Sequence, residues 1–429
     1  MNLFDYMMCF FVSNCIRSMP EGPSQVHLSL SEESSSMTVS WNDIKSVSDS
    51  MVKWGLEANQ LSNQSGGHLR RFGSFGREIF SYWSVMNNLE PDTTYYYQVG
   101  AKDNLSPIFS FKTLPFGTNW SPRVAIFGDL GLKNGQAIPI LNNRSRAGDF
   151  DVVAHIGDIA YDLYSSHGLI GDEFMQAIEP MTSAVPYMVV PGNHEYLPII
   201  GDNGIAYRYR YKMPGDSNDM YTFTVGPILF ITISTEFYYY LEGGGAKKVS
   251  EQREWLDNVL TEANQPENRA KHPWIIVLGH RPFYCSSSRF GRCPGGTTWI
   301  RTGSNYLGKG LEDLFYKGGV DLVFGGHNHQ YERMYPVYDL QVSGSPNPYQ
   351  NPNATTYIIS GSAGNQEDLD GFKEDSPAWS AFRNTDYSYT KLTAFNSTHL
   401  MLQQISVPSE TIIDSVIITQ RNHRPFDQP

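Results

Sequence analysis

Five apolar runs between residues 124 and 329 end in the same way, and this ending constrains the fold more than any other feature of the chain. Each run is strand-like and leads into glycine, which is followed by a side chain able to bind a metal ion. The runs and their endings are Val124–Phe127 with GDLG, Val152–Ile156 with GDIAY, Tyr187–Val190 with PGNHE, Ile275–Leu278 with GH, and Val320–Phe324 with GGHNH. One such junction would carry no weight, whereas five make coincidence remote.

The repeated ending indicates one shared site. Glycine lets the backbone turn tightly where a strand leaves a sheet. Apolar strands separated by helical or irregular segments predict an α/β pattern, in which side chains at the carboxyl ends of neighbouring strands meet in one crevice. Carboxylate and phenolate oxygens suit a hard trivalent ion, whereas imidazole and amide oxygen suit a borderline divalent ion. We therefore expect these side chains to gather around metal.

The region before residue 122 has a different sequence pattern. Short alternating runs such as Val26–Leu30 and Met37–Trp41 predict half-buried strands. The turn and aromatic strand of Leu89–Val99 look like the tyrosine corner of a fibronectin type III-like β-sandwich. Residues 115–122 are rich in Pro, Gly, Asn and Ser and indicate a linker. We expect a sandwich over residues 23–115 and a second domain over residues 122–429.

One helix of the second domain can be predicted from its pattern. Residues from about 249 to 264 place Trp255, Leu256, Val259 and Leu260 on one apolar stripe, and Ser250 can cap the first turn. A stripe of this kind is typical of core packing.

The charge balance limits the partners of this chain. A formal net charge of −12 and a pI of about 5.4 argue against nucleic acid or an acidic membrane surface. The sequence has no apolar run of about 18 residues, so a membrane span is not expected. A phosphate-handling protein with this charge must supply positive charge locally, and bound metal ions are one way to do so.

The N-terminus and the cysteines bear on the compartment. Residues 1–19 have a short apolar centre but an acidic residue where a signal peptide has a basic one, so a signal peptide and an incomplete or misassigned start both stay open. Without that stretch, Cys285 and Cys293 remain, and their spacing suits a small disulfide loop, with two cytosolic thiols as the alternative. We expect a secreted or lysosomal protein. Glycosylation sequons begin at Asn63, Asn104, Asn119, Asn143, Asn353 and Asn396.

The same segments carry a resemblance to a known family. GDLG, GDIAY, GNHE, GH and GHNH resemble the five signature blocks of metallophosphoesterases, and the tyrosine of GDIAY is typical of purple acid phosphatases. Longer segments such as HRPFYC and IISGSAGNQED are similar to the animal long form, the acid phosphatase type 7 group, through most of residues 23–420. The resemblance implies an α+β two-domain chain, in which the sandwich precedes an α/β metallophosphoesterase domain of two mixed β-sheets flanked by helices.

The resemblance also implies which residues bind metal. A ferric site would be ligated by Asp129, Asp158, Tyr161 and His329. A divalent site, holding zinc, manganese or ferrous iron, would share Asp158 as a bridge and add Asn193, His280 and His327. The charge of the two cations outweighs that of two aspartates and a phenolate, so this site can hold a phosphate dianion. Two ions about 3.5–4 Å apart also lower the pKa of a bound water, which makes a metal-bound hydroxide the expected nucleophile.

His194 is the expected catalytic residue. The matching histidine of the family is thought to steady the phosphoryl group or to give a proton to the leaving alkoxide. A hydrogen-bonded histidine that only supports the ligands is the alternative. Glu195 is expected to orient His194, whereas Tyr331, Glu332 and Arg333 are expected to support the last histidine block without taking part in the chemistry.

One departure from the family concerns substrate contacts. Plant long forms carry histidines shortly after the GH block, whereas residues 281–293 contain none and offer Arg281, Arg289 and Arg292. A guanidinium group can bind phosphate bidentately. Arg289 and Arg292, together with Asn193, are therefore candidate substrate contacts, with solvated loop arginines as the alternative.

The expected function is hydrolysis of small phosphate monoesters at acidic pH. A ferric ion should keep its bound water ionised at low pH while His194 stays protonated. A metallophosphodiesterase or nucleotide phosphohydrolase shares most of these ligands but usually lacks a tyrosine at the position of Tyr161. A non-catalytic binding protein would normally have lost ligands. Long plant relatives pair into dimers, so a homodimer is allowed, although no cysteine is placed for a bridge between subunits.

Overall fold

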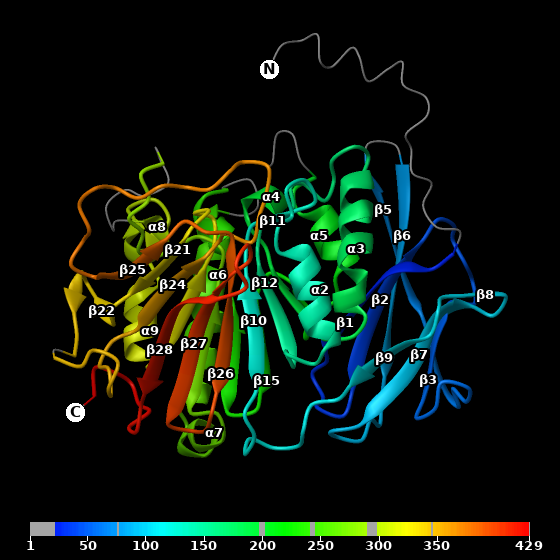
Figure 1. Cartoon of the computed structure of the whole chain (residues 1–429), viewed down its shortest axis with the longest axis horizontal. Coiled ribbons are helices and arrows are strands. Elements are labelled where there is room, and N and C mark those ends of the chain that lie inside the picture. Colours follow the sequence, from blue (N-terminus) through cyan, green and yellow to red (C-terminus); the bar gives the residue numbers. More distant parts are fainter. Residues whose placement is uncertain are drawn as a thin grey trace, which may run out of the picture.

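The computed structural model describes residues 22–74, 77–196, 202–240, 245–289, 298–344 and 346–428. Figure 1 shows a smaller β-region, in blue, lying beside a larger region in which strands are layered between helices. The expected signal segment 1–19, together with Arg292 and Cys293, lies outside the described residues.

The N-terminal region is a β-sandwich. One sheet has the strand order β1-β2-β6-β5, and the other has the order β4-β3-β7-β8 with β9 paired to β7. The strands are β1 (Ser24–Leu30), β2 (Met37–Asp43), β3 (Met51–Gly55), β4 (Asn63–Gly66), β5 (His68–Ser74), β6 (Arg77–Met86), β7 (Thr94–Ala101), β8 (Asn104–Leu105) and β9 (Phe109–Lys112). The Tyr95 hydroxyl accepts a hydrogen bond from the Glu90 N–H at 3.0 Å, as in a tyrosine corner. The predicted sandwich is confirmed.

Strands β1 and β2 are more buried than their alternating sequences predict. Every residue of both strands is buried, so the polar faces are covered as well. The cover comes from the second region of the chain. The Val26 N–H of β1 donates to Glu179 of that region at 2.9 Å, and the hydroxyl of Thr182 donates to the Val26 carbonyl at 2.9 Å. Alternation reports the pleat of a strand, but it cannot report a second layer supplied by a distant segment.

The second region contains two mixed sheets. The first has the order β14-β12-β10-β26-β27-β28 and the second β15-β16-β17-β20-β24-β21-β25. The strands of the first are β10 (Arg123–Phe127), β12 (Val152–Ile156), β14 (Tyr187–Val190), β26 (Ser388–Ala394), β27 (His399–Ser406) and β28 (Ile412–Thr419). Those of the second are β15 (Tyr221–Val225), β16 (Ile228–Thr232), β17 (Trp274–Leu278), β20 (Leu322–Gly325), β21 (Tyr331–Met334), β24 (Thr356–Ser360) and β25 (Ser380–Asn384). The predicted two-sheet architecture is confirmed.

Helices flank these sheets (Figure 1). They are α2 (Ile138–Arg146), α3 (Leu169–Thr182), α6 (Gly245–Ala263), α7 (Pro266–Lys271) and α9 (Glu312–Lys317). Leu256 and Leu260 of the predicted stripe are buried, and Trp255 and Val259 are partly buried against the same cluster. The helix begins earlier than predicted, at Gly245, so Ser250 lies inside it and the predicted cap was wrong.

Short elements fill the loops. They are β11 (Leu130–Gly131), β13 (Ile159–Ala160), α4 (Asn193–Tyr196), α5 (Ile205–Arg210), η1 (Thr235–Tyr238), α8 (Trp299–Thr302), β18 (Gly303–Ser304), β19 (Gly308–Lys309), β22 (Val337–Tyr338) and β23 (Gln341–Val342). Among the described residues, no helix has the length and apolar content needed to cross a membrane.

The two sheets bring their parallel strands to one edge. Strands β10, β12 and β14 run parallel in the first sheet, as do β17 and β20 in the second. The sheets are joined there by a hydrogen bond from the Gly128 N–H, just after β10, to the carbonyl of Ser360, the last residue of β24, at 2.8 Å. All five ligand-bearing segments begin where these strands end, so the loops that carry them meet at the same edge.

Candidate metal centre

The backbone at this edge is bent into an uncommon conformation. Four of the expected ligands have positive φ angles, namely Asp129 at 60°, Asp158 at 54°, Tyr161 at 50° and His327 at 66°. Residues other than glycine avoid positive φ angles. Those that adopt them cluster at functional sites, where the surrounding structure holds them in place. The loops therefore orient these four side chains through a backbone conformation that costs free energy.

Asp129, Tyr161 and His329 form the first ligand group. The Tyr161 hydroxyl lies 3.2 Å from Asp129 Oδ1 and 3.0 Å from His329 Nε2, and His329 Nε2 lies 3.5 Å from Asp129 Oδ1. All three side chains are buried. His329 Nδ1 lies 2.8 Å from the Asp368 carbonyl oxygen, so this nitrogen carries the proton and donates it. The Nε2 lone pair is then left for the centre.

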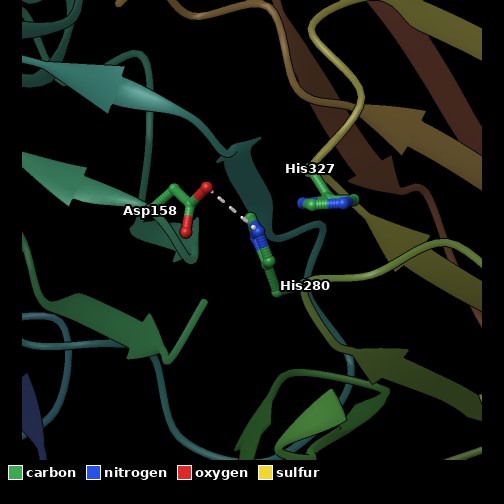
Figure 2. A group of neighbouring side chains, drawn as sticks. All are labelled: Asp158, His280 and His327. Carbon is green, nitrogen blue, oxygen red and sulfur yellow. Dashed lines mark ion pairs between the residues drawn. The ribbon is translucent and has the colours of Figure 1, made fainter. Parts of the chain in front are cut away.

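The second ligand group contains Asp158, His280 and His327, whose ligand atoms all lie within 4.8 Å of one another. Figure 2 shows the three side chains converging from separate loops. His280 Nε2 lies 3.3 Å from Asp158 Oδ2 and 3.2 Å from Asn193 Oδ1, which brings the fourth expected ligand into the group. His280 Nδ1 donates to the Ile156 carbonyl at 2.9 Å, so its Nε2 also directs a lone pair inward.

The two groups adjoin each other. The His327 N–H donates to Asp129 Oδ2 at 2.8 Å, which links the second group to the first. Gly326 sits between them, because a Cβ atom there would lie 2.4 Å from Asp129 Oδ2 and 3.5 Å from His280 Nδ1. A Cβ on Gly192 would similarly lie 2.3 Å from Asp158 Oδ1. These glycines are needed for close approach as well as for the turn that the sequence suggested.

His194 lies against both groups. Its backbone N–H donates to Asp158 Oδ1 at 2.9 Å, and its ring centroid is 4.3 Å from that of Tyr161. Its Nδ1 is hydrogen-bonded to Asp162, and its Nε2 lies 3.5 Å from Glu367. Burial opposes charge on this ring, but the nearby carboxylates of Asp158, Asp162 and Glu367 outweigh it and raise the pKa of His194 well above its ordinary value.

Glu195 has a different role from the expected one. Its carboxylate accepts hydrogen bonds from the N–H groups of Gly192 at 2.7 Å, Asp158 at 3.0 Å and Ile159 at 2.9 Å. These bonds tie the GDIAY loop to the GNHE loop. The expectation that Glu195 orients His194 was wrong, because Asp162 holds the ring nitrogen. Burial, helped by the charge of Asp158, raises the pKa of Glu195 to about 8.

Strand β21, which belongs to the second sheet, is held in place by Tyr331, Glu332 and Arg333. Tyr331 and Arg333 donate to Asp414 of β28 at 2.8 and 2.7 Å. Glu332 is buried and accepts hydrogen bonds from the N–H and hydroxyl of Ser286, at 2.9 and 2.6 Å. Ser286 belongs to the loop that follows His280, so Glu332 supports that loop.

Arg289 is paired with acidic side chains. Its guanidinium lies 3.1 Å from Asp370 Oδ1 and 3.6 Å from Glu367 Oε2. Asp370 in turn accepts a hydrogen bond from the His329 N–H at 3.2 Å. Arg289 therefore braces the loop that carries Glu367 and Asp370. Cys285 is buried, and since Cys293 lies outside the described residues, their pairing stays a prediction.

Asp162, Glu367 and Asp368 are among the site residues that the sequence did not predict. Asp162 directly follows Tyr161, and the other two lie in the segment GNQED. The signal for Asp162 was its place next to a ligand in a conspicuous block. Glu367 and Asp368 follow no apolar strand directly, so no strand end in the sequence points to them.

The donor set fits a pair of cations. Carboxylate oxygens, a phenol and an amide oxygen converge with two imidazoles whose outer nitrogens are hydrogen-bonded to backbone carbonyls, an arrangement that fixes the ring tautomer for metal binding. Burial alone would raise the pKa of Asp158, but His280 and His194 lower it well below its ordinary value. The carboxylate of Asp158 is thus held in its anionic, ligating form.

Comparisons with known proteins identify the family of this chain. Residues 23–113 match the model of the purple acid phosphatase N-terminal domain, residues 122–331 that of the calcineurin-like phosphoesterases, and residues 354–415 that of the iron/zinc purple acid phosphatase-like protein C domain. Acid phosphatase type 7 of Danio rerio is 42% identical over 94% of this chain and 92% of its own length. The chain belongs to the purple acid phosphatase family.

Other members of the family extend the comparison. The human acid phosphatase type 7 is 40% identical over 93% of this chain and 91% of its own length. Among solved structures, the purple acid phosphatase PPD1 from yellow lupin seeds aligns with a TM-score of 0.78, covers 94% of this chain and 75% of its own, and is 24% identical in sequence. That likeness is one of fold. The predicted membership of the purple acid phosphatases is confirmed.

Proposed function

We propose that this chain hydrolyses small phosphate monoesters at acidic pH with a binuclear Fe(III)–M(II) centre. The first ligand group would hold the ferric ion, with Asp158 shared between the ions, and the second group with Asn193 would hold zinc, manganese or ferrous iron. When bound, the two cations supply positive charge for the phosphoryl oxygens and lower the pKa of a bound water. The observation that carries the proposal is the convergence of seven donors from five separate loops.

The protein's own groups would divide the remaining work. His194 is kept charged by three carboxylates and lies beside the shared ligand Asp158, so it can steady the phosphoryl group or give a proton to the leaving oxygen. Glu195 holds the loops that carry Asp158 and Asn193 at a fixed separation. The tyrosine at position 161 favours monoester over diester hydrolysis, since related diesterases usually lack it.

Activity on p-nitrophenyl phosphate tests the proposal. The full chain is expected to release p-nitrophenol faster at acidic than at neutral pH. Asp158→Ala should reduce turnover to background, because it removes the ligand common to both ions, whereas Asp103→Ala, at an exposed loop position, should leave turnover unchanged. Equal activity of the wild type and Asp158→Ala would refute the proposed centre.

A further inference from the structure

Arg281 lies at the border of the second ligand group and is held rigidly there. It follows His280 directly, and its Nη1 lies 3.1 Å from His327 Nε2. Its Nε donates to both oxygens of Glu236, at 3.0 and 2.9 Å, and Glu236 is fully buried. The buried ion pair fixes the plane of the guanidinium group, so Arg281 forms a firm edge of the centre.

Aromatic rings continue outward from Arg281. The guanidinium carbon lies 4.2 Å from the ring centre of Tyr239. The Tyr239 ring in turn stacks on Trp299, with centroids 5.5 Å apart and an interplanar angle of 24°. Trp299 is 49% exposed although it is the largest side-chain type. The stacked side chains of Arg281, Tyr239 and Trp299 therefore extend from a ligand-bearing loop to solvent.

Tyr240 is a third aromatic ring near Arg281. It lies 5.9 Å from the Arg281 guanidinium and is half-buried. Burial raises the pKa of Tyr240 to about 12, with contributions from the charges of Glu236 and Asp158.

We propose that Tyr239, Tyr240 and Trp299, together called the aromatic wall, form a subsite for a planar ring carried by the leaving group of the substrate. Stacked and edge-on contacts between rings stabilise a complex beyond the apolar area that they bury. Arg281 connects the wall to the ligand group, so an ester whose phosphate is held at the centre can lay its leaving group along the rings. The inference rests on the proposed phosphatase function and adds the class of substrate.

Two pairs of phosphate esters distinguish how the ring is attached to the phosphate. In adenosine 5′-monophosphate a sugar separates the ring from the phosphate, and ribose 5-phosphate is the matching ester without the ring. O-phosphotyrosine carries the ring on the ester oxygen itself, and O-phosphoserine is its counterpart. Comparing each variant with the wild type on the same ester removes the intrinsic reactivity of the leaving group.

The experiment measures kcat/KM for the four esters with the wild type, Trp299→Ala and Trp299→Phe. We expect Trp299→Ala to lower kcat/KM about fivefold for at least one ring-bearing ester, mainly through KM, while its counterpart changes little. Trp299→Phe should restore most of the loss, since it keeps a ring. Phe116→Ala is the matched control, because Phe116 is an 84% exposed aromatic residue in the linker between the two regions.

The outcomes are distinguishable. A selective loss for adenosine 5′-monophosphate assigns the wall to a ring beyond a sugar, and one for O-phosphotyrosine assigns it to a directly attached ring. Equal changes for ring-bearing and ring-free esters would overturn the aromatic wall while the phosphatase function stands. Failure of the wild type to hydrolyse any of the four esters would instead overturn the proposed function.

Discussion

Asp162 illustrates how one side chain can determine the role of its neighbours. It follows Tyr161 in the chain and is hydrogen-bonded to Nδ1 of His194, while the opposite ring nitrogen points toward Asp158 and Glu367. A ring held in this way turns its Nε2 toward the ligand Asp158. The carboxylate also supplies part of the charge that keeps His194 protonated.

Replacing Asp162 by asparagine should therefore weaken catalysis without dismantling the centre. Loss of a hydrogen-bond partner in the outer layer of a metal site typically costs about 10- to 100-fold, and we expect kcat for p-nitrophenyl phosphate to fall by that order. Iron content should be unchanged, because Asp129, Tyr161 and His329 are untouched. An Asp162→Asn variant with wild-type kcat would contradict the assigned role of His194.

Among the secondary-structure elements, the contact between β1 and α5 holds a buried histidine that makes it sensitive to acid. His27 of β1 is buried there, with its Nδ1 2.8 Å from the Gln25 carbonyl and its Nε2 3.1 Å from the Arg210 carbonyl. Burial lowers the pKa of His27 to about 4, and the charge of Arg210 adds to the effect, although the two carbonyls oppose it. The imidazole is thus neutral where the sandwich meets the second region.

The sign of the pH effect follows from this lowered pKa. The unfolded chain binds a proton at His27 near pH 6.5, whereas the folded chain does so only near pH 4. The contribution of neutral His27 to the free energy of unfolding is therefore fully present above pH 6.5. It is lost as the pH falls to about 4, by roughly 3 kcal/mol in total. A protein that works in acid would meet this loss in its working range.

Urea unfolding at pH 6.5 and at pH 4 checks the effect. The free energy of unfolding should fall less between the two pH values in His27→Gln than in the wild type, by about 3 kcal/mol. His68→Gln replaces an exposed histidine of the same sandwich and should behave as the wild type. Parallel pH dependence in the wild type and His27→Gln would show that β1 does not carry this sensitivity.

For the molecule as a whole, exposure of the sequons is consistent with passage through a secretory compartment. Asn63, Asn104, Asn119, Asn143, Asn353 and Asn396 are all exposed. When the full chain is expressed in a secreting eukaryotic host, we expect a mass excess that an N-glycosidase removes. Recovery of the protein at its unmodified mass of 48.4 kDa, less any cleaved leader, would contradict this expectation.

The sequence pointed to the residues of the candidate metal centre but not to the groups that surround it. Each ligand follows an apolar strand and a glycine, and the end of a strand is a local signal. Glu367 and Asp368 lie in an irregular loop, and their approach to His194 and His329 depends on how that loop folds back. The interface of β1 with α3 and α5 depends likewise on pairs far apart in the chain, such as Gln25 and Arg210 at 2.9 Å. Periodicity within one segment cannot report such pairs.

The metal content of the native protein, read together with its visible absorption, tests the binuclear centre most directly. We expect one iron and one divalent metal per chain, a visible band from the Tyr161 phenolate on ferric iron, and loss of that band in Tyr161→Phe. Zinc alone, with no iron and no colour in the active wild type, would contradict the proposed centre.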